Sequence, residues 1–151
     1  MTVKASAGRK LAQAAARLRV SADPHGPRYA LVVVAVLAAV DDFLFRSKIR
    51  AVAKHVGVEV QFAQTPEEIL TQARALKPGL VILDLNSAKA DPVATIAALK
   101  ADAETARTRT IGFASHVHVD LINSARNAGA DQVLPRSAFA MHLAEILASG
   151  S

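Results

Sequence analysis

Three carboxylates carry the chemistry that the sequence offers. Asp84 interrupts a continuous apolar run that Asn86 closes, and Asp41 with Asp42 ends a second apolar run over residues 30–40. Carboxylates within about 5 Å of each other repel by roughly 3 kcal/mol per pair at an effective dielectric constant of about 20, so they share protons or bind a cation. A hard divalent cation such as Mg²⁺ fits, because it takes one or two carboxylates and keeps positions for water and a phosphoryl group.

A carboxylate in such a cluster can also act as a nucleophile. It then forms an aspartyl phosphate while a metal ion neutralises the charge on the phosphoryl oxygens. A cation and a hydroxyl group at the rim would complete a phosphate pocket, and Arg136 and Ser115 are the candidates. His116 and His118 form another pair of potential ligands, but no third ligand accompanies them and a surface loop is the simpler interpretation.

The elements that must position these residues alternate between strand-like and helix-like segments. This alternation is typical of a parallel sheet covered by helices on both faces. The predicted strands are residues 30–40, 58–63, 80–85, 110–114 and 132–134. Right-handed crossovers favour an α/β, flavodoxin-like (βα)5 doubly wound sheet with the order 2-1-3-4-5. Because this order puts the first and third strands side by side, Asp41, Asp42 and Asp84 are predicted to converge at its carboxyl edge.

Local signals place the helix ends. Thr65 and Glu68, with a proline between them, predict a capping box at the start of a helix. Ser137 is predicted to cap a single last helix that turns Met141, Ile146 and Leu147 inward. Asp41 or Asp42 would alternatively serve only as the N-cap of the helix that follows, which is the plain structural interpretation of a strand-end aspartate.

Charge and composition divide the chain into residues 1–29, a basic N-terminal extension and linker, and residues 30–151, a globular domain. Residues 1–30 contain six basic residues and one acidic residue, whereas the rest of the chain contains twelve of each. Residues 11–18 favour a helix, and residues 21–27 have the composition of a linker. Nucleic-acid binding is therefore unlikely, and the sequence permits it only through basic residues 1–29.

Several classes of protein are disfavoured. The chain has 151 residues and no cysteine, which excludes disulfides and thiolate metal sites and fits a cytoplasmic location. The apolar run over residues 30–40 is about half the roughly 20 residues that a membrane-spanning helix needs, so no membrane span is expected. Neither a dinucleotide-binding nor a P-loop glycine motif is present, and Asp84-Leu85-Asn86 lacks the second aspartate of a D-x-D phosphatase. A hydrolase or nucleotide enzyme therefore ranks last.

Three motifs together resemble the receiver domain of bacterial two-component response regulators, of the chemotaxis-regulator type. They are the Asp41-Asp42 pair, Val-Ile-Leu-Asp-Leu-Asn over residues 81–86, and Ala-Gly-Ala-Asp over residues 128–131. The resemblance implies that Asp84 is the phosphoacceptor and that Asp41, Asp42, Asp84 and the backbone carbonyl of Asn86 hold Mg²⁺. It implies a histidine kinase or phosphotransfer protein as donor and signalling through a downstream protein partner, with no catalysis beyond autophosphorylation and autodephosphorylation. A homodimer is compatible with it.

The chain departs from the family pattern at the positions that would sense phosphate. Arg136 stands where the family has lysine, and Val133 stands where it has an aromatic residue. The hydroxyl residue after the fourth strand falls on Ala114, and on Ser115 only if the loop shifts by one. The leading hypothesis is a single-domain receiver phosphorylated on Asp84. The alternative is a pseudo-receiver, an interaction module that acts without phosphorylation.

Overall fold

The central element of the fold is a five-stranded parallel sheet. The computed structural model describes residues 18–21, 28–31, 33–115 and 118–150. The strands of this sheet are β3 (Val36–Ala39), β4 (Val60–Phe62), β5 (Leu80–Asp84), β6 (Arg109–Ala114) and β7 (Gln132–Pro135). Their order is β4-β3-β5-β6-β7, which in chain order is 2-1-3-4-5. The predicted flavodoxin-like topology is therefore confirmed.

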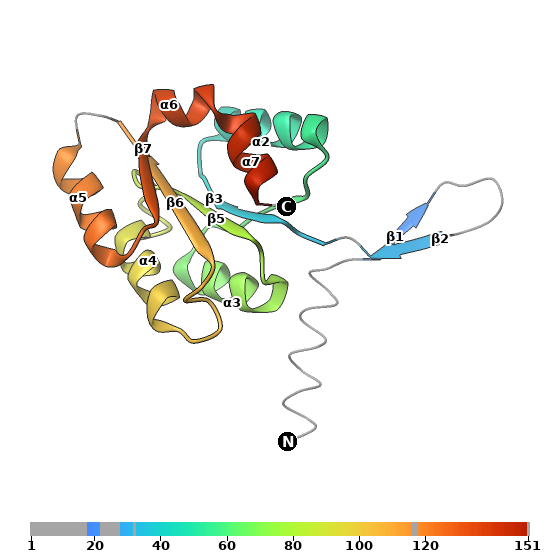
Figure 1. Cartoon of the computed structure of the whole chain (residues 1–151), viewed down its shortest axis with the longest axis horizontal. Coiled ribbons are helices and arrows are strands. Elements are labelled where there is room, and N and C mark those ends of the chain that lie inside the picture. The colour runs from blue at the N-terminus through green and yellow to red at the C-terminus, as the bar shows by residue number, and fades with distance from the viewer. Residues whose placement is uncertain (1–17, 22–27, 32, 116–117, 151) are drawn as a thin grey trace, which may run out of the picture.

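Helices cover both faces of the sheet (Figure 1). They are α2 (Phe43–Val56), α3 (Pro66–Leu76), α4 (Pro92–Ala101), α5 (Val119–Ala128), α6 (Arg136–Met141) and α7 (Leu143–Ser149). Figure 1 shows α2, α6 and α7 on one face and α3, α4 and α5 on the other. Among the described residues, no helix is both long and apolar enough to span a bilayer.

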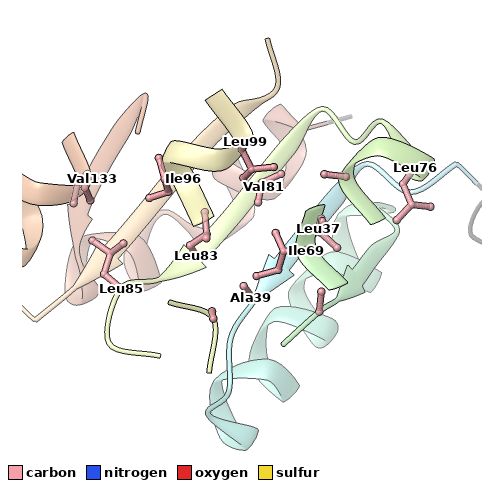
Figure 2. Packing of buried hydrophobic residues seen from close by; sticks show 14 of the residues in the cluster. Leu37, Ala39, Ile69, Leu76, Val81, Leu83, Leu85, Ile96, Leu99 and Val133 are labelled. Atoms are coloured by element: carbon pink, nitrogen blue, oxygen red, sulfur yellow. The ribbon is translucent and has the colours of Figure 1, made fainter. Parts of the chain in front are cut away.

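Two apolar layers hold the helices against the sheet. Because successive side chains of a strand point to opposite faces, Leu37 and Leu83 pack toward α3 and α4, whereas Ala38 and Ile82 pack toward α2 and α7. Figure 2 shows the first layer, in which Ile96 approaches the strands from α4. β5 lies at the centre of the sheet, and each of its five residues is buried. This burial explains the unbroken apolar run that precedes Asp84.

The helix ends follow their local signals in α3 but not at the C-terminus. Thr65 accepts a hydrogen bond from the backbone N–H of Glu68 at 3.2 Å, as the capping box predicts. The single last helix was a wrong prediction, since α6 and α7 are separate helices that meet at His142. Ser137 lies inside α6, and Met141 is 78% exposed because Phe139 is the α6 residue that enters the core.

The N-terminal region differs most from the prediction. β1 (Leu18–Ser21) and β2 (Arg28–Leu31) pair antiparallel as a separate two-stranded sheet. The apolar run over residues 30–40 is therefore two elements, since its start belongs to β2 and β3 begins only at Val36. Strand propensity in short segments flanking Pro24 and Gly26 explains why neither a helix at Leu18 nor a linker at Ser21 is found. The rest of the predicted N-terminal helix and residues 22–27 of the predicted linker lie outside the described residues.

At the amino ends of β6 and β7, Lys100 and Asp131 join α4 to the sheet. The ammonium of Lys100 lies 2.8 Å from the carboxylate of Asp131, which also accepts the backbone N–H of Thr110 at 2.8 Å. Partial burial opposes ionisation, but these bonds from Lys100 and Thr110 hold the pKa of Asp131 below its ordinary value. The aspartate of the Ala-Gly-Ala-Asp motif is therefore structural.

Replacing Asp131 with asparagine is expected to destabilise the fold at neutral pH. The loss should be about 1 kcal/mol, because the three hydrogen bonds that the charged carboxylate accepts from Lys100 and Thr110 weaken, while solvent screens the exposed half of the carboxylate. A lowered folded-state pKa gives stability that is present above the ordinary value of 3.8 and lost as the pH falls through the lowered pKa. Urea titrations at pH 7 and pH 3 should therefore show a larger difference at pH 7, and an equal difference would contradict the role of the charge.

Candidate functional site

The carboxyl ends of β3 and β5 bring Asp41 and Asp84 together. The two strands are parallel neighbours, with Ala39 paired to Leu83, so the residues that follow meet at the same edge. Asp84 is the last residue of β5 and only 4% exposed. The charge of Asp41 is near enough to raise the pKa of Asp84. The two carboxylates therefore lie at the same edge of the sheet, at the ends of neighbouring strands.

Asp84 is a buried carboxylate with partners for both oxygens. Its Oδ1 accepts the backbone N–H of Asn86 at 2.9 Å, and its Oδ2 accepts a guanidinium N–H of Arg136 at 3.2 Å. Burial is the main influence on the pKa of Asp84 and raises it, while the bonds from Asn86 and Arg136 act against this rise. The net shift is upward, so ionisation of Asp84 carries a cost in the folded protein.

Asp41 has one satisfied oxygen and one unsatisfied oxygen. The hydroxyl of Ser87 donates to its Oδ2 at 2.5 Å. Its Oδ1 is buried and has no hydrogen-bond partner among the described residues. A buried carboxylate oxygen without a partner costs free energy, so such an atom in a native fold calls for an ion or water that the protein atoms do not supply.

Asp42 caps the helix that follows it, as the plain structural interpretation of a strand-end aspartate predicts. It is the N-cap of α2, and its Oδ1 accepts the backbone N–H of Phe45 at 3.0 Å. In the described part of the chain, no three histidine, aspartate or glutamate side chains are arranged to hold a metal ion. Asp41 and Asp84 are thus the carboxylate pair at this edge, and a ligand role for Asp42 stays a prediction from the resemblance.

Arg136 connects Asp84 to a cluster of aromatic rings. It begins α6 directly after β7, and its guanidinium carbon lies 5.4 Å from the ring centre of Phe45 and 5.3 Å from that of Phe113. The rings of Phe113 and Phe139 stack at 4.3 Å. Cation–π contact and the planar fork of arginine hold the guanidinium beside the carboxylate, where it is also oriented to meet an anion.

Ser115 faces Arg136 across a cleft rather than contacting Asp84. The cleft has a volume of about 370 Å³ and is lined by Phe45, Ser115, Arg136, Ser137 and Ala140. Both predicted rim residues therefore border one space, and Arg136 connects this space to Asp84. Ala114 and Val133, 0% and 7% exposed, belong to the apolar layer that packs against α3, α4 and α5, and they supply no polar group for a relay.

Two polar residues of the site escaped the sequence reasoning. Ser87 is 5% exposed and bonded to Asp41, although these residues are far apart in the chain. The side-chain nitrogen of Asn86 lies 3.1 Å from Nδ1 of His118 at the start of α5. The only sequence signal for Ser87 is its position three residues after Asp84, whereas the sequence indicates His118 only as a potential metal ligand.

The donors at this edge fit a hard cation. Mg²⁺ is bound in proteins through one or two carboxylates together with water molecules. Asp41 supplies an oxygen that lacks a protein partner, and Asp84 supplies a second carboxylate that a cation would help to ionise. The chemistry of the pair therefore fits Mg²⁺ better than a soft metal, which would need thiolate or imidazole ligands.

Comparisons with solved structures agree with this fold. A response regulator from Hahella chejuensis has a TM-score of 0.68 at 21% identity, covering 76% of this chain and 92% of that one. The chemotaxis response regulator CheY4 of Vibrio cholerae has a TM-score of 0.67 at 18% identity, covering 80% and 100%. The Mn²⁺-bound form of response regulator Rcp1 has a TM-score of 0.60 at 16% identity, covering 75% and 88%.

The sequence also matches a family model, although no curated protein matches it. The model describes the response regulator receiver domain and matches residues 36–148, from the first residue of β3 almost to the end of α7. Receiver domains are modules of two-component signalling and are generally not enzymes. They typically bind Mg²⁺ at an acidic pocket. The chain belongs to the response regulator receiver domain family.

Proposed function

We propose that this receiver is switched by phosphorylation of Asp84 and signals by binding another protein in the cytoplasm. The observation that carries the proposal is the geometry of Asp84, a buried carboxylate at the central strand end with Arg136 on one oxygen and Asp41 nearby. A histidine kinase or phosphotransfer protein would supply the phosphoryl group. We assign residues 1–29 to an extension and residues 30–151 to the receiver-like domain, with β2 (Arg28–Leu31) crossing the boundary between them.

The reaction assigned to Asp84 is a displacement at phosphorus. A carboxylate oxygen of Asp84 forms the new bond to phosphorus, the nitrogen–phosphorus bond of the donor phosphohistidine breaks, and the imidazole leaves. Mg²⁺, when bound, would neutralise charge on the phosphoryl oxygens. Asp41 and Asp84 would hold it, with the Asn86 carbonyl and Asp42 as the further ligands that the family suggests. The Mn²⁺-bound form of the structural neighbour Rcp1 supports a divalent cation here.

Arg136 and the cleft would receive the transferred group. The guanidinium is already within hydrogen-bond distance of Asp84. It can therefore pair with the phosphoryl oxygens once Asp84 is phosphorylated. Ser115 lines the same cleft and offers a hydroxyl donor. The raised pKa of Asp84 means that its nucleophilic, ionised form depends on these positive charges.

Phosphorylation is expected to add one phosphoryl group per chain. The full-length protein would be incubated with acetyl phosphate and Mg²⁺ and weighed intact by mass spectrometry. Asp84→Asn and a sample with excess EDTA should show no addition. Asp120→Asn, which changes an exposed aspartate in the first turn of α5, is the matched control and should gain one group like the wild type.

The second candidate is a pseudo-receiver that acts without phosphorylation. The buried, apolar Ala114 and Val133 favour it, because they offer no hydroxyl or aromatic ring to carry a change from the pocket to the surface. No phosphoryl addition to the wild type under any of these conditions would favour this candidate and overturn the first.

A further inference from the structure

Ser87 is the polar residue of the site whose contacts the phosphoryl chemistry does not use. Its backbone N–H donates to the carbonyl of Asp84 at 3.0 Å, and its hydroxyl donates to Oδ2 of Asp41 at 2.5 Å. With 5% exposure, this hydroxyl is shielded from water. Ser87 therefore links the strand that carries one carboxylate to the side chain of the other.

The hydroxyl of Ser87 decides which oxygen of Asp41 is left for a cation. A serine hydroxyl has one proton, and here that proton is bonded to Oδ2. The other oxygen, Oδ1, is the buried atom without a partner. A ligand carboxylate fixed in this way keeps one orientation before the metal arrives, which is how hydrogen-bonded neighbours raise the affinity of metal sites.

The same hydroxyl leads toward the start of α4. The backbone N–H of Ala90 approaches Oγ of Ser87 at 3.4 Å, and the carbonyl of Ala90 accepts the hydroxyl of Thr95 at 2.5 Å. Thr95 is 1% exposed and lies in the first turns of α4, which Pro92 begins. A series of hydrogen bonds, part-buried at Asp41 and buried at Ala90 and Thr95, thus runs from Asp41 to α4.

We propose that Ser87 is the positioning residue of the Mg²⁺ site. It holds Asp41 for the cation and couples occupancy of the site by Mg²⁺ to the start of α4. The inference rests on the proposed function, because it assumes that Asp41 and Asp84 bind Mg²⁺. In this proposal the loop between β5 and α4 transmits a change at the metal site to α4, which the apolar Ala114 and Val133 cannot do because they have no polar side chain.

The test is a titration of the ¹⁵N-labelled full-length protein with MgCl₂, followed by NMR. Ser87→Ala should weaken Mg²⁺ binding about tenfold or more, the range found when a neighbour that orients a metal ligand is removed. Ser87→Thr keeps the hydroxyl and should restore most of the affinity. Ser47→Ala, which removes an exposed hydroxyl on α2, should bind like the wild type.

The amide signals of Ala90 and Thr95 test the second half of the proposal. They should shift on Mg²⁺ binding in the wild type and in Ser87→Thr, and stay unchanged in Mg²⁺-saturated Ser87→Ala. Thermal unfolding without Mg²⁺ checks that each variant is folded. If Ser87→Thr does not fold, Ser87→Cys takes its place, and its weak S–H donor should give Mg²⁺ affinity below that of the wild type.

The outcomes distinguish a failure of the inference about Ser87 from a failure of the proposed function. Equal Mg²⁺ affinity in Ser87→Ala and the wild type overturns the inference and leaves the proposed function intact. Shifts at Ala90 and Thr95 that persist in Ser87→Ala overturn the link to α4. A wild type that binds no Mg²⁺ overturns the inference together with the metal site of the proposed function.

Discussion

The Asp84→Asn protein is expected to unfold at a clearly higher temperature than the wild type at pH 7 without Mg²⁺. Burial is the main cause of the raised pKa of Asp84, and the bonds from Asn86 and Arg136 do not fully offset it. The ionised carboxylate therefore destabilises the resting fold. Asparagine keeps an oxygen that can accept the backbone N–H of Asn86 while removing the buried charge.

The sign of the pH dependence follows from the direction of this shift. A folded-state pKa above the unfolded value gives stability that is fully present below about 3.8 and is lost as the pH rises through the raised pKa. The advantage of Asp84→Asn should therefore be small at pH 3.5 and grow toward pH 7, and saturating Mg²⁺ should reduce it by stabilising the wild type. Differential scanning calorimetry across this range measures it, and a variant less stable than the wild type at pH 7 would contradict the assignment.

Replacing Phe113 with alanine is expected to cost about 3–5 kcal/mol in free energy of unfolding, the range for a large buried aromatic side chain. Phe113 is 0% exposed, stacks on Phe139 at 4.3 Å and meets the ring edge of Phe45 at 5.2 Å. The loss of its ring also removes one side of the aromatic platform under Arg136. Site and core are thus stabilised by the same ring.

Urea denaturation of Phe113→Ala and Phe43→Ala provides the comparison. Phe43 is 71% exposed at the start of α2, so its truncation should change the free energy of unfolding by less than about 1 kcal/mol. Similar losses in the two variants would show that the cluster around Phe113 is not packed as described.

The fold was predictable where sequence patterns are local and strong. Buried strands produce continuous apolar runs, and the handedness rule of parallel connections leaves few sheet orders. These two facts placed Asp84 and Asp41 at neighbouring strand ends. Apolar content alone does not mark where one strand ends and another begins. The run over residues 30–40 therefore predicts one strand, although it contains parts of β2 and β3.

The site was predictable only as far as strand ends determine it. Proximity of Asp84 to Arg136 follows from sheet topology, because β7 and β5 both end at this edge. The bonds from Ser87 to Asp41 and from Asn86 to His118 depend on loop conformation and side-chain rotamers, which no periodicity encodes. Asp42 illustrates the same limit. An aspartate that follows a strand can either bind a metal or cap the next helix, and the sequence does not distinguish the two, whereas the structure shows Asp42 as the N-cap of α2.

The residue that carries the phosphoryl group can be identified by chemical reduction. The full-length protein would be treated with acetyl phosphate and Mg²⁺, reduced with borohydride, which converts an aspartyl phosphate to homoserine, and mapped by peptide mass spectrometry. We expect homoserine at position 84 alone, and none in a sample prepared with EDTA. Homoserine at another aspartate, or at none in the Mg²⁺ sample, would contradict the assignment of Asp84 as the phosphoacceptor.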